Sequence, residues 1–153
     1  NYGLIINEIG MEGMIDLLQE QYLQPVAAHV FPQEGSTLDV HHAFVVQYKQ
    51  GEDLGLDMHT DNSEVTFNIC LGKSFDGSGL TFCGQMGCPD HRHLKHMYQH
   101  RLGRCVMHLG RQRHGADDLT SGERMNLIIW NRNINFRMTN VYQVRPLKLG
   151  SDI

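Results

Sequence analysis

Apolar and polar residues alternate without exception along Glu64-Val65-Thr66-Phe67-Asn68-Ile69-Cys70-Leu71. This two-residue period is typical of a β-strand, because successive side chains of a strand point to opposite faces of the sheet. One face of the segment is apolar, and the other carries small, mostly polar side chains. The segment therefore predicts a half-buried strand.

Shorter segments of the same kind lie on either side of it. Ala43–Lys49 is rich in β-branched and aromatic residues and places Phe44, Val46 and Tyr48 on one face. Further strands are predicted at Leu80–Cys83, Arg104–Leu109 and Arg124–Trp130. The last of these is apolar enough to be buried on both faces, and Gly122 closes the turn before it. Short strands separated by turns predict a mainly β fold of the jelly-roll type.

A helix is predicted ahead of the strands. Apolar residues recur at helical spacing at Met11, Met14, Ile15, Leu18 and Tyr22. This pattern predicts an amphipathic N-terminal helix over residues 11–23 that packs on the sheet, followed by a connection bracketed by Pro25 and Pro32. We therefore expect a single domain over residues 1–153, with a helical lead-in at about 11–23 and a β core at about 40–135.

Composition narrows the class of protein. The 153 residues are 41% hydrophobic and 20% charged, and no apolar run is long enough to cross a membrane. A net charge of −4 argues against a nucleic-acid backbone as the main partner. Four cysteines in a chain of this size favour reduced thiols, and so an intracellular compartment, cytoplasmic or nuclear. Because Asn1 is not an initiator methionine, we expect a processed or excised domain whose targeting segment is missing.

A candidate metal site combines residues that are distant in the sequence. His59 and Asp61 are two residues apart, so in an extended segment both side chains leave the same face. Alone, each reads as a surface loop residue. With His114 they supply two nitrogens and one oxygen on one face of a metal, an arrangement that suits non-heme Fe(II) because the opposite face stays open. Zinc is the competing metal.

Arg124 follows the last of these histidines by ten positions. Its same-face neighbours on the predicted strand include Asn126 and Trp130, which would place it inside a pocket. A buried guanidinium needs a matching anion, and its planar fork suits a carboxylate. The alternative is an exposed arginine that pairs with Glu123 or Asp118. We favour the pocket.

Set among short strands, His59-Thr60-Asp61 followed by His114 and Arg124 resembles the Fe(II)- and 2-oxoglutarate-dependent dioxygenases, in their prolyl and lysyl hydroxylase branch. The resemblance spans roughly residues 44–131. It is strongest, through residues 55–61 and 113–130, to the "2-oxoglutarate and iron-dependent oxygenase domain-containing" group. The fold it implies is a double-stranded β-helix, the jelly roll of this family.

The resemblance also implies residue roles. His59, Asp61 and His114 would bind iron, and Arg124 would bind the distal carboxylate of 2-oxoglutarate. Tyr48 would line the cosubstrate pocket or serve as an ordinary core tyrosine. Further pocket residues would be Thr66, Asn68, Cys70, Asn126 and Trp130. Cys70 departs from the pattern, because some prolyl hydroxylases have at this position a tyrosine that assists the arginine.

The implied activity is hydroxylation with Fe(II), 2-oxoglutarate, O2 and ascorbate as the reductant, and with release of succinate and CO2. Trp130 stands where nucleic-acid demethylases of the superfamily have a second arginine, and Arg124 where histone-demethylase relatives commonly have lysine. Both departures favour a protein side chain or a small molecule as substrate. The alternative function is a catalytically idle, metal-containing jelly roll that acts as a binding module.

A second cluster of possible metal ligands comprises Cys83, Cys88, His91, His93, His96 and His100. Zinc binding is one interpretation. The cysteines do not have the tight spacing of zinc pairs, however, and the histidines alternate with Arg92, Lys95 and Arg101. We therefore favour a solvated, cationic loop over the pocket mouth, able to contact an acidic substrate segment.

Overall fold

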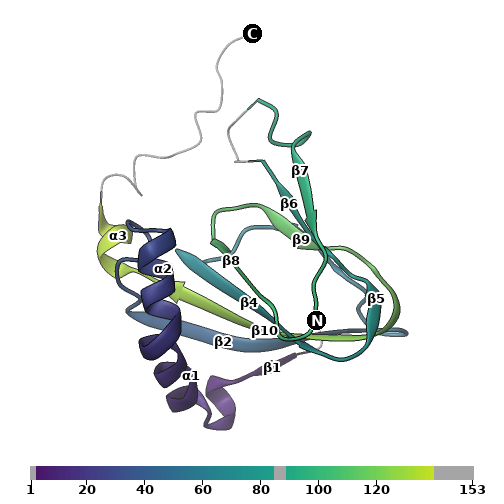
Figure 1. The fold of residues 1–153 in the computed structure, drawn as a ribbon, viewed down its shortest axis with the longest axis horizontal. Helices are drawn as coiled ribbons and strands as arrows, with labels where there is room; N and C mark the ends of the chain where they lie inside the picture. The colour runs from purple at the N-terminus through teal and green to yellow at the C-terminus, as the bar shows by residue number, and fades with distance from the viewer. Residues whose placement is uncertain (1–2, 85–88, 140–153) are drawn as a thin grey trace.

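Two antiparallel sheets face each other in the computed structural model, which describes residues 3–84 and 89–139 (Figure 1). The larger sheet has the order β1-β2-β10-β4-β8, with β5 paired to β10, and the smaller sheet has the order β3-β9-β6-β7. The larger sheet consists of β1 Gly3–Ile5, β2 Val40–Lys49, β4 Val65–Gly72, β5 Phe75–Gly77, β8 Cys105–Leu109 and β10 Leu119–Arg132. The smaller sheet consists of β3 Leu56–His59, β6 Leu80–Cys83, β7 Lys95–Tyr98 and β9 His114–Ala116. The predicted jelly roll with an N-terminal helix is confirmed.

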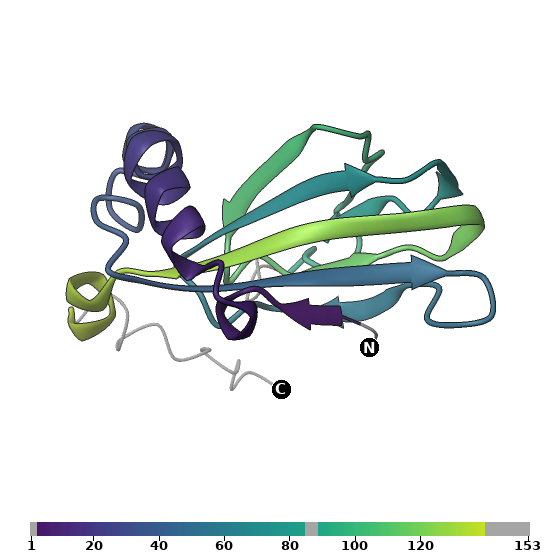
Figure 2. The same ribbon diagram turned by 90° about the horizontal axis from the view of Figure 1, so that it is seen from below.

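The predicted alternation along β4 separates the core from the interior of the jelly roll. Val65 and Phe67 belong to the main hydrophobic cluster, with residues of β2, β10 and the N-terminal helices. Thr66 and Asn68 leave the other face of β4 and line a cavity between the sheets. The helices cover the outer face of the larger sheet, which leaves its inner face free to build a site (Figure 2).

The pair β2–β10 forms the longest ladder of the molecule. Its register pairs Arg124 with Tyr48, Ile128 with Phe44, Trp130 with His42 and Arg132 with Val40. Because side chains alternate along a strand, these residues share the inner face of the sheet. The ladder therefore runs the length of the cavity and continues beyond it.

The N-terminal helical region differs from the prediction. A turn Asn7–Ile9 leads into α1 Glu12–Leu18, which continues through a π-helical turn, Gln19–Leu23, into α2 Gln24–Val30. The predicted connection after Pro25 is wrong, because this proline lies in the first turn of α2 and the helical segment continues to Val30. No helix in the described part of the chain is long and apolar enough to span a membrane.

The buried face of these helices is also narrower than predicted. Ile15 is fully buried, but Met14 and Tyr22 are 48% and 62% exposed. Buried instead is Gln19, whose Nε2 donates a hydrogen bond to the carbonyl of Leu38 at 2.9 Å. The main chain satisfies the Nε2 group of this amide, whereas Oε1 is buried without a hydrogen-bond partner among the described residues.

Two further boundaries differ from the prediction. β10 begins at Leu119, so Gly122 lies within the strand rather than in a turn before it. Its φ of +81° and the carbonyl of Ser74, which a Cβ would approach to 2.1 Å, both require glycine at this irregular point. The last helix, α3 Ile134–Met138, follows β10 closely. Asn133 is its N-cap residue, and the side chain of Asn133 accepts a hydrogen bond from the amide of Phe136.

Candidate functional site

The three predicted metal ligands come together at one end of the smaller sheet. His59 ends β3, His114 begins β9, and the two residues are cross-strand partners. Asp61 follows just beyond β3, in a segment tied to the carbonyl of Gly110 by its own amide at 2.8 Å. The candidate ligand atoms of the triad all lie within 4.8 Å of one another.

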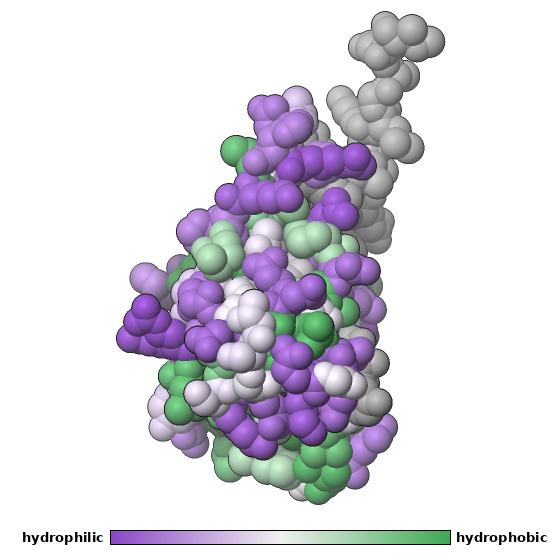
Figure 3. Space-filling model, turned by 90° about the vertical axis from the view of Figure 1, so that its right-hand side faces the viewer, coloured by the Kyte–Doolittle hydropathy of each residue, from purple (hydrophilic) through white to green (hydrophobic). Residues whose placement is uncertain are grey.

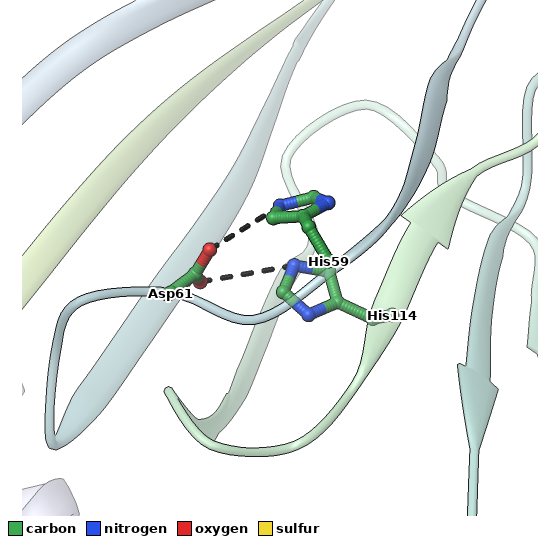
Figure 4. A group of neighbouring side chains, drawn as sticks. All are labelled: His59, Asp61 and His114. Carbon is green, nitrogen blue, oxygen red and sulfur yellow. Dashed lines mark ion pairs between the residues drawn. The ribbon is translucent and has the colours of Figure 1, made fainter.

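The two histidines are oriented to present Nε2. Nδ1 of His59 lies 2.8 Å from the carbonyl of Asp57, and Nδ1 of His114 lies 2.9 Å from that of Gln112. A carbonyl only accepts, so each Nδ1 carries a proton, and Nε2 is the ring nitrogen left to bind a metal. These Nε2 atoms lie 3.3 and 3.7 Å from the two oxygens of Asp61 (Figure 4).

Asp61 is buried but remains suited to be an anion. Burial raises its pKa, but the hydrogen bond with His59 and the nearby His114 outweigh burial, with a further contribution from Thr66, so that the pKa lies below its ordinary value. Thr66 Oγ1 donates to Asp61 Oδ2 at 2.7 Å and lies 2.7 Å from the hydroxyl of Ser63. Two neutral imidazoles and one fixed carboxylate on one side of a metal leave the other side for exogenous ligands. The triad therefore fits an iron ion, and zinc by the same donors.

A cavity of about 260 Å³ opens beside the triad. Of the predicted pocket residues, Tyr48, Thr66, Asn68, Arg124 and Trp130 line it, together with the triad. Cys70 and Asn126 are buried but are not among its lining residues. The remaining wall is apolar and consists of Phe44, Val46, Leu56, Leu80, Ala116 and Ile128.

Arg124 is the most unusual residue of this cavity. It is 1% exposed, Nη1 donates to the carbonyl of Ser78, and the guanidinium lies 4.9 Å from the centre of the Tyr48 ring. Its Nε has no partner, and no carboxylate lies within ion-pair distance of it in the described part of the chain. Burial lowers the pKa of Arg124. The alternative of an exposed arginine paired with Glu123 is wrong, because Glu123 pairs with Lys73 at 3.0 Å.

His100 lies close to Arg124, against expectation. It is only 2% exposed, and its Nε2 donates to Asn68 Oδ1 at 3.1 Å, an oxygen that Asn126 Nδ2 also approaches. Burial, assisted by Arg124, lowers the pKa of His100 to about 4, so the ring is neutral. Placing His100 in a solvated loop was therefore wrong. Its neighbours in the sequence are polar, and only its long-range contact with β4 reveals its position.

His108 is a second residue that the sequence reasoning missed. It is 5% exposed, its Nδ1 donates to the carbonyl of Leu109 at 3.0 Å, and its Nε2 lies 3.8 Å from Asp61 Oδ2. Its ring centre is 4.3 Å from that of His114. The alternation of the predicted strand 104–109 would have placed His108 on the same face as Val106, which packs inside the jelly roll.

The described residues of the cysteine and histidine cluster do not form a second metal site. Within the described part of the chain, the ligand atoms that lie close enough together to hold a metal are those of His59, Asp61 and His114. Cys88 lies outside the described residues. Four residues of the expected loop form strand β7, which pairs with β6. The exposed side chains around it include Arg92, His93, Lys95 and His96. Figure 3 shows that hydrophilic side chains gather at the upper end of the face it draws.

Comparison with known proteins gives consistent relatives. No family model matches the chain. It is 39% identical over 150 residues to "2-oxoglutarate and iron-dependent oxygenase domain-containing protein ICU11" of Arabidopsis thaliana, covering 94% of this chain and 38% of that protein. It is 43% identical over 134 residues to "2-oxoglutarate and iron-dependent oxygenase domain-containing protein 2" of Homo sapiens, covering 86% of this chain and 38% of that protein.

A more distant relative is human "Procollagen-lysine,2-oxoglutarate 5-dioxygenase 1", which is 31% identical over 124 residues, covering 78% of this chain and 16% of that protein. The chain therefore spans less than two fifths of the length of these relatives.

Solved structures share the fold. An "Oxidoreductase, 2OG-Fe(II) oxygenase family, from Burkholderia pseudomallei" superposes with a TM-score of 0.61 at 19% identity, over 79% of this chain and 55% of that one. The "epimerase SnoN in complex with Fe3+, alpha ketoglutarate and nogalamycin RO" gives a TM-score of 0.66 at 14% identity, over 98% of this chain and 71% of that one. At these identities the likeness establishes the jelly roll alone.

Proposed function

Because this chain belongs to the 2-oxoglutarate- and iron-dependent oxygenase family, we propose that it is the catalytic domain of a dioxygenase that hydroxylates a protein side chain. His59, Asp61 and His114 would hold Fe(II), and Arg124 would hold the distal carboxylate of 2-oxoglutarate. Ascorbate is the proposed reductant.

The observation that carries this proposal is the condition of Arg124. A guanidinium removed from water costs several kcal/mol unless an anion meets it, on the order of the penalty known for buried ions. Arg124 lines the same cavity as the metal triad and has no carboxylate within ion-pair distance in the described residues. A dicarboxylic acid bound between the triad and Arg124 would satisfy both ends of the cavity.

The side chains of the site have different roles in the proposed reaction. When bound, Fe(II) with 2-oxoglutarate and O2 would supply the oxidation: one oxygen atom of O2 would enter a substrate C–H bond, and the other would end in the succinate formed as 2-oxoglutarate loses CO2. Thr66 holds Asp61 in position through its hydroxyl, and the main-chain carbonyls hold the rings of His59 and His114. The apolar wall, which includes Phe44 and Ile128, excludes water from the reacting atoms.

Two observations support the choice of substrate and compartment. The lysyl hydroxylase relative acts, by its name, on a lysine of procollagen, which supports a protein side chain. Cys70, Cys83 and Cys105 are free thiols, which supports a reducing compartment, the cytoplasm or nucleus.

An anaerobic titration tests the proposal. Fe(II) added with 2-oxoglutarate should produce the weak visible charge-transfer band of the iron chelate in the wild type and not in His114→Ala. Arg124→Gln should need far more 2-oxoglutarate to reach the same band. Arg104→Gln is the matched control, because Arg104 is exposed and does not line the cavity. A wild-type protein that binds metal without this band would instead be an idle binding module.

A further inference from the structure

The inner face of the β2–β10 ladder continues past the metal cavity. Arg124 lies near the end of β10 that pairs with β5, and Trp130 and Arg132 lie toward α3 (Figure 1). If 2-oxoglutarate reaches from Arg124 to the triad, as proposed above, the substrate must approach the metal from the opposite end. The residues of this ladder that lie toward α3 therefore face the incoming substrate.

A second pocket, of about 270 Å³, lies at that end. It is lined by Val40, His41, His42, Asn62, Trp130 and Arg132. Trp130 lines both this pocket and the metal cavity, so the two are neighbours across its ring. Phe44 meets that ring edge to face, with ring centres 5.2 Å apart at 89°. The boundary between the two pockets is thus an aromatic wall.

Trp130 offers an unused hydrogen-bond donor here. Its Nε1 is buried and has no partner among the residues that the structure describes. An indole N–H can only donate, and leaving it buried without an acceptor is unfavourable. Buried tryptophans usually find such a partner. A ligand that points an acceptor at Nε1 would supply it.

Arg132 adds a positive charge that no carboxylate of the described residues pairs with. Its Nε donates to the carbonyl of Asn62 at 3.3 Å, and within residues 3–84 and 89–139 no carboxylate lies at ion-pair distance from it. The neighbouring cation Arg137 differs, since it pairs with Glu64 at 2.6 Å. His41 likewise pairs with Asp16 at 2.7 Å. This end of the cavity therefore presents a half-buried guanidinium beside a neutral donor.

We propose that this pocket, with Arg132 and the Trp130 indole N–H at its centre, is a substrate subsite that binds a carboxylate. The assignment rests on the proposed function and specifies its substrate as an acidic one. One guanidinium and one neutral donor match the single charge of a carboxylate, whereas a phosphate dianion is usually met by several arginines. The carboxylate belongs to an acidic residue of a peptide or to a small acid.

The ladder also sets a spacing. Trp130 and Arg132 are two residues apart on β10, which is about 7 Å at the rise of a strand. Trp130 also lines the metal cavity, and an extended peptide has the same rise, so the residue whose carboxylate meets Arg132 and the Trp130 indole N–H would lie within about two positions of the residue at the metal. The subsite would thus select peptides that have an acidic residue near the hydroxylated residue.

Trp130 provides the readout, because it is the only tryptophan of the chain. The probes are seven-residue peptides with a central lysine or proline and one glutamate at each flanking position in turn, each with a glutamine twin. A second arm uses N-acetylglutamate amide and N-acetylglutamine amide. Binding is followed by Trp130 fluorescence with Fe(II) and 2-oxoglutarate under anaerobic conditions, and succinate formation is measured in air.

We expect one glutamate position to bind about tenfold or more tightly than its glutamine twin, as for a charge-assisted contact. Arg132→Gln should abolish this preference, Arg132→Lys should keep part of it, and Arg104→Gln should leave it unchanged. Preference in the small-acid arm alone would support the carboxylate subsite and assign it to a small acid. All variants should keep the chelate band, which also shows that they fold.

Equal affinity for glutamate and glutamine in both arms would overturn the subsite, as would a preference that survives in Arg132→Gln. Tighter binding of a phosphoserine peptide than of the glutamate peptide would overturn the carboxylate assignment. These failures are distinct from failure of the proposed function, in which the wild type would lack the chelate band altogether.

Discussion

Replacing Arg124 with methionine should weaken 2-oxoglutarate binding and leave the free energy of unfolding nearly unchanged. The guanidinium is 1% exposed and lacks a carboxylate partner among the described residues, so the apo protein bears its desolvation cost. Replacing buried ions with apolar side chains of similar size is often neutral or stabilising by about 1–4 kcal/mol. Against this, the variant loses the hydrogen bond to the Ser78 carbonyl and the contact with Tyr48, together worth about 2–4 kcal/mol. The free energy of unfolding should therefore change little.

The affinity for 2-oxoglutarate should fall much further. Removing one partner of a desolvated, charge-assisted contact costs about 2–5 kcal/mol, which is a loss of about 30-fold or more in affinity. In the wild type, 2-oxoglutarate at 100 times its Kd should add about 2.7 kcal/mol to the free energy of unfolding, and the variant should gain about 0.9 kcal/mol or less at that concentration.

Urea unfolding with and without 2-oxoglutarate, in the presence of metal, measures both quantities. Arg124→Lys is the matched control, since it keeps the charge and loses the planar fork. The reasoning would be refuted if Arg124→Met were destabilised by more than about 3 kcal/mol while still binding 2-oxoglutarate normally. Arg124 would then be a structural residue that anchors Ser78.

Two further predictions follow from the hydrogen bonds of the site. Thr66→Val removes the donor that holds Asp61 Oδ2 and should weaken Fe(II) binding about 10- to 100-fold without unfolding the protein, as measured by competition with a chromophoric chelator; unchanged affinity would show that Asp61 needs no such support. The pKa of His100 is about 4 in the folded protein, against an ordinary value of 6.5. As the pH falls, the unfolded chain therefore takes up this proton at a higher pH than the folded protein does. The stabilisation present above pH 6.5 is lost as the pH falls toward 4. His100→Gln should therefore reduce the loss of unfolding free energy between pH 7 and pH 5 by about 2 kcal/mol, and an identical pH profile would contradict the assignment of the shift to His100.

The parts of the site that sequence could predict depend on short-range rules. The alternation along residues 64–71 placed Thr66 and Asn68 on one face, and the same period correctly put Arg124 on the inner face with Trp130. The spacing of His59 and Asp61 depends on only two residues of extended chain. In these cases the position of a side chain follows from its neighbours in the sequence.

The parts that could not be predicted depend on contacts between distant segments. His100 lies in a polar run, and its burial follows from packing against Asn68 on β4. The alternation of side chains also points Asn126 and Cys70 toward the inside of the jelly roll. Neighbouring side chains cover them, however, so they are buried without lining the cavity. The absence of an ion-pair partner for Arg124 among the described residues is likewise a property of the whole fold.

The distribution of the triad over the chain couples metal binding to folding. β3 and β9 are short, and their pairing is interrupted between Leu56 and His59. Asp61 and His114 lie about 50 residues apart in the sequence, so the unfolded chain lacks the assembled site, and the free energy of metal binding adds to the stability of the folded state. Amide hydrogen exchange along β3 should then slow on metal addition. The availability of iron would thereby determine how often β3, the edge strand of the smaller sheet, separates from β9.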